Sequence, residues 1–133
     1  MDSYTLGASF CRHSCKMGSV CIFVYKNLTS MNIDLGKFSH ERDIEASTVK
    51  IIVNHVNICI LSIYRAPSGD FAHLLVKLEG ILNLLQRNDT QLIICGDINI
   101  NYLVENNKKN SSGFFIGFLQ FHWYCLLSNQ NPE

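Results

Sequence analysis

The sequence predicts an α/β domain, in which helices cover a layered β-sheet, and two observations support this class. Short apolar runs rich in β-branched residues, typical of buried strands, occur at residues 20–25, 56–64 and 92–95. Between the last two runs, apolar residues recur at helical spacing over residues 71–85. Strands that alternate with helices favour a layered α/β or α+β domain.

Length and composition agree with one folded domain. The chain has 133 residues, of which 47% are hydrophobic and 17% are charged, and its formal net charge is zero. This composition supplies enough apolar material for a core and excludes a disordered chain. The balanced charge excludes a strongly basic protein that coats nucleic acid and an acidic solvating tail.

The first half of the chain predicts two hairpins. Residues 4–10 and 19–25 are expected to pair as strands, the second of them buried on both faces. Residues 26–43 read as a loop or a short, irregular edge strand. Residues 44–53 alternate between apolar and polar, and a turn at Asn54 and His55 joins them to the strong strand at 56–64.

The second half predicts a helix followed by a strand. Asp70 is expected to cap a helix over residues 70–87, which Gly80 weakens by about 1 kcal/mol relative to alanine. A short strand at 92–95 follows, then a polar loop at 101–113 and a second helix at 113–122. Lys77 is expected to be exposed, and five residues of the first helix are expected to be buried against the sheet: Phe71, Leu74, Leu78, Leu82 and Leu85.

Targeting signals and membrane spans are not evident. No run of 18 or more apolar residues occurs, and the N-terminus lacks a basic region followed by an apolar one. The sequence therefore predicts an intracellular protein, nuclear or cytoplasmic, that does not associate with membranes. The six cysteines are accordingly expected to be reduced thiols.

The segment at 92–101 (LIICGDININ) is the first candidate site. A buried strand there delivers Asp97, Asn99 and Asn101 to its C-terminal end, where open α/β sheets bind ligands. Asp97 could accept a proton from water, and Asn99 could donate a hydrogen bond to a phosphate oxygen. The alternative is an ordinary Gly-Asp turn after a strand, in which the two asparagines cap the loop.

The segment at 62–70 (SIYRAPSGD) is the second candidate site. Here too a strand ends in polar groups, the phenol of Tyr64 and the guanidinium of Arg65, before a turn that Pro67 fixes. Both side chains could bind a phosphodiester, because arginine offers a bidentate fork to phosphate. The alternative is a simple strand end, with Tyr64 half-buried and Arg65 solvated.

Three segments in order resemble the endonuclease/exonuclease/phosphatase family, in its branch from non-LTR (LINE-type) retrotransposons. Residues 16–24 read KMGSVCIFV, residues 63–67 read IYRAP and residues 96–101 read GDININ, whereas the family pattern runs GGV.IFV, YRPP, a helix and GDFN.N. The resemblance covers residues 4–132 and implies a sandwich of mixed β-sheet layers with flanking helices.

The resemblance also implies roles for individual residues. Tyr64 matches a tyrosine that contacts the scissile phosphate, Asp97 an aspartate that positions or deprotonates the attacking water, and Asn99 an asparagine that stabilises the phosphoryl oxygen. Arg65 and Asn101 are expected to bind substrate. An intact relative would nick DNA with Mg²⁺, a reaction in which positioning and charge neutralisation supply most of the catalysis.

The chain departs from the family at both ends. The metal-binding glutamate of the family precedes the segment that begins here at Tyr4, and its Ser-Asp-His triplet has no counterpart, because no aspartate follows Asp97. Within the motifs, Ser19 replaces a glycine, and Ile98 replaces an aromatic residue or leucine. We expect residues 1–133 to form one partial domain that lacks the family's N- and C-terminal segments and retains no Mg²⁺.

The expected function is therefore the remnant of a retrotransposon DNA endonuclease, inactive as this chain. One alternative is a non-catalytic interaction or structural domain that kept the fold and lost the chemistry. Another is a nuclease completed by sequence outside this chain.

Other constellations point less clearly to chemistry. The spacing of Cys11, His13, Cys15 and Cys21 does not fit a zinc knuckle, so the sequence predicts no metal ligands. His55 lies in a turn and His73 on a polar helix face, and neither is expected to be catalytic. Three aromatic residues, Phe121, Trp123 and Tyr124, are expected to pack in the core rather than stack on bases.

Overall fold

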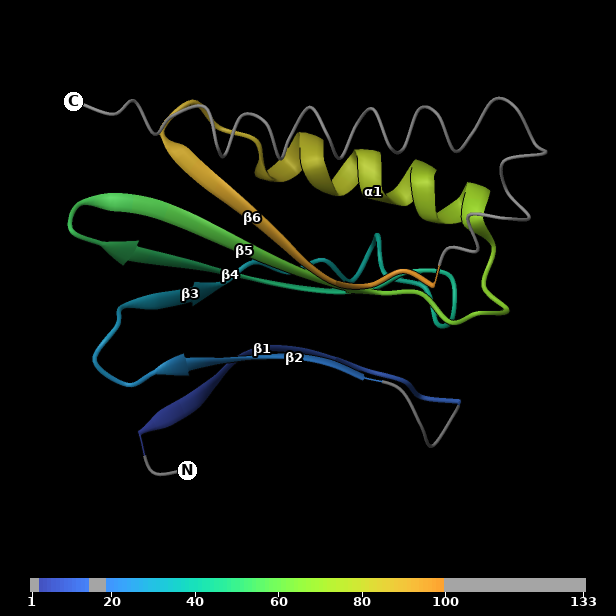
Figure 1. Ribbon diagram of the computed structural model, residues 1–133, viewed down its shortest axis with the longest axis horizontal. Helices are drawn as coiled ribbons and strands as arrows, with labels where there is room; N and C mark the ends of the chain where they lie inside the picture. The colour runs from blue at the N-terminus through green and yellow to red at the C-terminus, as the bar shows by residue number, and fades with distance from the viewer. Residues whose placement is uncertain (1–2, 15–18, 100–133) are drawn as a thin grey trace. The chain divides into compact units, whose positions relative to one another are not determined.

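The computed structural model describes residues 3–14 and 19–99 (Figure 1). These residues form one helix and six strands, and the strands make up two sheets. One sheet pairs β1 with β2, and the other has the order β3-β4-β5-β6. The predicted α/β class is therefore confirmed in its broad form, with mixed sheets and one helix. The predicted loop at 101–113, the helix at 113–122, Asn101 and the aromatic residues at 121–124 lie outside the described residues.

The first predicted hairpin is confirmed. β1 (Tyr4–Cys11) pairs antiparallel with β2 (Ser19–Tyr25), and the register shifts at Gly7, between Leu6 and Ala8. The expectation that the second strand is buried on both faces was wrong. Val20 and Val24 are buried, but Phe23 on the other face is 56% exposed. The hairpin is covered on one side only, so its apolar residues divide between core and surface.

The second hairpin is confirmed together with its turn. β4 (Glu45–Val53) pairs antiparallel with β5 (Val56–Tyr64) in register from end to end. Asn54 and His55 join them with φ angles of 49° and 66°, which are the positive values that a two-residue hairpin turn requires. β3 (Ser30–Asn32) pairs with β4 as the short edge strand expected within residues 26–43.

The helix α1 (Phe71–Leu85) connects two parallel strands. Asp70 caps the helix as predicted, because its carboxylate accepts a hydrogen bond from the backbone N–H of His73 at 3.0 Å. The chain then returns as β6 (Thr90–Asp97), which is longer than the predicted strand and pairs parallel with β5. No helix among the described residues is long and apolar enough to cross a membrane.

The two faces of the four-stranded sheet bury different partners. On one face, Val49 and Ile51 of β4 form a core with Ala8 and Val24 of the β1–β2 hairpin. Residues at the alternate positions point to the opposite face, along which α1 runs (Figure 1). This second face also buries apolar residues, among them Ala46, Cys59, Leu61 and Ile63.

The helix confirms most of the predicted buried residues. Leu74, Leu78, Ile81, Leu82 and Leu85 are buried, whereas Phe71, which was expected to be buried, is half-buried. Lys77 is also half-buried rather than exposed, because its ammonium donates to the carbonyl oxygen of Lys37 at 3.4 Å. Gly80 has a packing reason, since a Cβ there would lie 2.6 Å from the Phe38 ring.

Candidate functional site

Tyr64 and Asp97 lie side by side at the C-terminal ends of two parallel strands. They are register partners in the β5–β6 pair, and the backbone N–H of Arg65 donates to the carbonyl oxygen of Asp97 at 3.0 Å. Directly paired residues point to the same face of a sheet. The two motifs therefore meet at one edge of the sheet, at Tyr64 and Asp97.

Gly96 explains why a glycine precedes Asp97. Its φ of +131° is one that side chains rarely adopt, and a Cβ there would lie 1.8 Å from the carbonyl oxygen of Ile63 on β5. At position 96, the backbone of β6 therefore lies closer to β5 than a residue with a Cβ atom would permit. This approach holds Asp97 against the end of β5, beside Tyr64.

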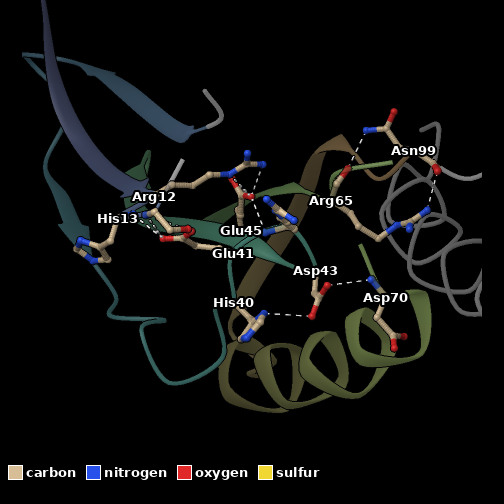
Figure 2. Close-up of polar contacts among 11 residues, drawn as sticks. Arg12, His13, His40, Glu41, Asp43, Glu45, Arg65, Asp70 and Asn99 are labelled. Atoms are coloured by element: carbon tan, nitrogen blue, oxygen red, sulfur yellow. Dashed lines mark hydrogen bonds and ion pairs between the residues drawn. The ribbon is translucent and has the colours of Figure 1, made fainter. Parts of the chain in front are cut away.

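Asp97 and Asn99 form a local turn at the end of β6. The exposed carboxylate of Asp97 accepts a hydrogen bond from the backbone N–H of Asn99 at 3.0 Å, which is the Gly-Asp turn expected as the alternative. Asn99 has a φ of 47°, which asparagine tolerates better than most residues. Its carboxamide donates to the carbonyl oxygen of Arg65 at 2.7 Å, so Asn99 is anchored at the end of β5 (Figure 2).

Arg65 holds the two strand ends together. Its side chain is buried, at 4% exposure, and its three guanidinium nitrogens donate to the carbonyl oxygens of Ile98 at 2.8 Å, Gly69 at 2.6 Å and Asn99 at 2.6 Å. Charge-assisted hydrogen bonds of this kind fix loop geometry strongly. The solvated Arg65 considered as an alternative is therefore wrong, while the role in substrate binding stays a prediction.

Glu45 extends the row formed by Tyr64 and Asp97 across a third strand. It is the register partner of Tyr64 on β4, so the three side chains point to the same face of the sheet. Glu45 is fully buried, and one oxygen accepts from Arg12 Nε at 2.6 Å and from the backbone N–H of Arg42 at 2.9 Å. Among the described residues, its other oxygen is buried without a hydrogen-bond partner.

Arg12 links this row to the first hairpin. Its guanidinium pairs with the Glu45 carboxylate at 2.5 Å (Figure 2), and it lies 5.6 Å from the centroid of the Tyr64 ring. The sequence analysis missed both residues. The two-residue turn at 54–55 fixes the β4–β5 register, so this turn could have placed Glu45 opposite Tyr64. Nothing in the sequence indicated Arg12, because only the packing of two sheets brings it there.

The segment at 40–45 carries two further carboxylates beside this row. Glu41 accepts hydrogen bonds from the Ser14 hydroxyl and the His13 backbone N–H, and these contacts lower its pKa to about 2. Partial burial raises the pKa of Asp43, but the hydrogen bonds from His73 and the Asp70 backbone N–H, together with the neighbouring imidazoles, lower it overall. His73, expected on a polar helix face, therefore contacts Asp43.

The geometry of the sheet edge suits an anionic ligand only in part. Tyr64 can donate a hydrogen bond, and Arg12 supplies a positive charge above the Tyr64 ring, but the exposed carboxylate of Asp97 needs a cation between itself and a phosphate. Asp97 is the one acidic side chain that the described residues present at the end of β6. A divalent ion at this edge would need water and phosphate oxygens for the rest of its coordination.

A scan against protein-family models finds no match, and a search of curated proteins finds no significant similarity.

Proposed function

We propose that this chain is a partial domain of the endonuclease/exonuclease/phosphatase type, derived from the Mg²⁺-dependent DNA endonuclease of a non-LTR retrotransposon. One observation carries the proposal. Tyr64 and Asp97, which belong to two separate motifs, are register partners at one sheet edge, and Asn99 is anchored beside them. The resemblance requires this convergence, since its three residues surround one phosphate.

In this proposal, each residue has a distinct role toward a phosphodiester. Tyr64 donates its phenolic hydrogen to a nonbridging oxygen, and Asp97 positions or deprotonates the attacking water. If a divalent cation were bound, Asp97 would be its carboxylate ligand, and the cation would neutralise phosphate charge. Asn99 contributes its carboxamide, and Arg65 fixes the turn that carries it. Glu45 and Arg12 position the Tyr64 ring from the neighbouring strand and hairpin.

The chain alone is proposed not to cleave DNA. Asp97 supplies one carboxylate, whereas Mg²⁺ is usually held by one or two carboxylates together with phosphate oxygens and water. The closing Asp-His pair of the family, which would supply an acid or base, has no match in the sequence. The zero net charge also gives little counterion-release drive toward DNA.

A plasmid-nicking assay with Mg²⁺ tests this inactivity. We expect the purified chain to nick supercoiled DNA no faster than its Asp97→Ala variant. The matched control is Glu79→Ala, which removes an exposed carboxylate from α1, away from the strand ends. Cleavage that disappears in Asp97→Ala and survives in Glu79→Ala would contradict the inactivity and identify Asp97 as catalytic.

A non-catalytic interaction domain is the second candidate, and one observation favours it. The guanidinium nitrogens of Arg65 and the carboxamide nitrogen of Asn99 all donate to backbone carbonyl oxygens of the chain. These donors stabilise the fold and are not directed at a ligand. The two candidates differ in one measurable property, since only the first binds a phosphodiester at the Tyr64 edge.

A further inference from the structure

Two imidazoles and a carboxylate meet on the surface at the start of α1. Nδ1 of His73 lies 2.8 Å from Oδ2 of Asp43, and Nδ1 of His40 lies 3.1 Å from the same oxygen. The two imidazole rings are 5.1 Å apart. Because His73 is 30 positions from Asp43, sequence spacing gave no sign of this group, and the sequence analysis predicted no metal ligands.

The backbone around these side chains is closely held. His40 and Ile44 exchange two backbone hydrogen bonds, at 2.7 and 3.0 Å, which close the turn that carries Asp43. Within this turn, the N–H of Arg42 donates to buried Glu45, and its carbonyl oxygen accepts from Ala66 at 2.8 Å. His40 and Asp43 thus lie in a turn that hydrogen bonds fix on both sides, and His73 lies in the first turn of α1.

Contacts outside the group orient its members. Oδ1 of Asp43 accepts the backbone N–H of Asp70 at 2.9 Å, whereas Oδ2 faces His40 (Figure 2) and also His73. Such an outer contact is typical of carboxylates that bind metals. His73 lies in the first turn of α1, whose N-terminus Asp70 caps, so its imidazole is held close to the turn that carries Asp43.

The distances suit a small tetrahedral ion. Metal–nitrogen and metal–oxygen bonds of 2.0–2.1 Å place neighbouring ligands of a tetrahedral ion about 3.3 Å apart. The three ligand atoms lie within 4.8 Å of one another, with two of their separations at 2.8 and 3.1 Å. Small side-chain rotations would therefore suffice to admit the ion.

We propose that His40, Asp43 and His73 bind Zn²⁺ through two imidazole nitrogens and one carboxylate oxygen. Imidazole ligands favour Zn²⁺ and related transition metals over Mg²⁺, which prefers oxygen. The His40 side chain is 60% exposed, so a fourth position is open to water. The site shares no residue with the strand ends of Tyr64 and Asp97 and does not depend on the proposed phosphodiester function.

Cobalt substitution tests the proposal on the full chain. We expect Co²⁺ to bind at one equivalent and to give the visible absorption of a tetrahedral ion with nitrogen and oxygen ligands. Zn²⁺ should displace it, and excess Mg²⁺ should not. An intense near-ultraviolet band from cysteine thiolates, or no binding at all, would overturn the proposal.

Single substitutions assign the ligands. His40→Gln and Asp43→Asn should each weaken Zn²⁺ binding by at least about 10-fold. Losing a residue that only orients a ligand already weakens metal binding by about this factor, so losing a ligand should weaken it at least as much. His55→Asn is the control, because His55 is exposed in the β4–β5 turn, at a positive φ that asparagine accepts. Thermal unfolding provides a second readout, since Zn²⁺ should raise the Tm of His55→Asn but not that of Asp43→Asn. Equal Zn²⁺ affinity in all three variants would refute the assignment.

Discussion

The two faces of the four-stranded sheet use the same strands for different purposes. The face along α1 buries apolar residues of β4 and β5, among them Ala46, Leu61 and Ile63. The face toward the hairpin begins with an apolar core and ends in the polar row Glu45–Tyr64–Asp97. Because side chains alternate along a strand, residues that stabilise the core and residues of the candidate site are neighbours in the sequence. Single substitutions can therefore test the two groups separately.

The largest expected effect comes from breaking the buried ion pair at the polar end. Arg12→Ala leaves the buried Glu45 carboxylate without its charged partner, which should cost about 3–5 kcal/mol in urea unfolding. Replacing both partners, in Arg12→Met with Glu45→Leu, should restore most of this loss. A loss under about 1 kcal/mol for Arg12→Ala would show that the pair is solvated.

On the helix-covered face, Leu78→Ala should cost about 2–5 kcal/mol because the side chain is buried and the site cannot collapse fully. Val76→Ala on the same helix is the control. Val76 is 68% exposed, so its truncation should change the free energy of unfolding by no more than about 0.5 kcal/mol. Similar losses in both variants would mean that α1 does not unfold together with the sheet.

At the strand end, Gly96→Ala should cost about 1–3 kcal/mol and should act locally. The added methyl group would collide with the Ile63 carbonyl oxygen, so β6 must move away from β5. Hydrogen exchange of the Arg65 amide, which donates to Asp97, should quicken more than that of amides in the β4–β5 pair. Unchanged protection at Arg65 would contradict the close approach described for Gly96.

The smallest effect on stability is expected for Asp97→Asn. The carboxylate is exposed, and asparagine can still accept the Asn99 backbone N–H, so the free energy of unfolding should change by no more than about 0.5 kcal/mol. Urea unfolding beside the wild-type chain measures this difference. A large loss would mean that Asp97 is a structural residue and would favour the non-catalytic alternative.

The sequence predicted local features better than those that depend on packing. Three local features were predicted correctly because each depends on residues close together in the chain: the Asn54–His55 turn, the Asp70 cap and the helical spacing of apolar residues. The alternative with a solvated Arg65 was wrong, since its carbonyl partners belong largely to another segment. The same limit hid the Arg12–Glu45 pair, which only the stacking of two sheets creates.

The most direct test of the central claim is a titration of the isotope-labelled chain with Mg²⁺ and a dinucleoside monophosphate, followed by amide chemical shifts. Binding at the Tyr64 edge should shift the amides of Tyr64, Asp97 and Asn99 and leave those of β3 and the Asn54–His55 turn unchanged. The same titration of Asp97→Asn, which is expected to keep its fold, should produce none of these shifts. Shifts that are absent from this edge, or equal in the two proteins, would contradict a phosphodiester-binding site here.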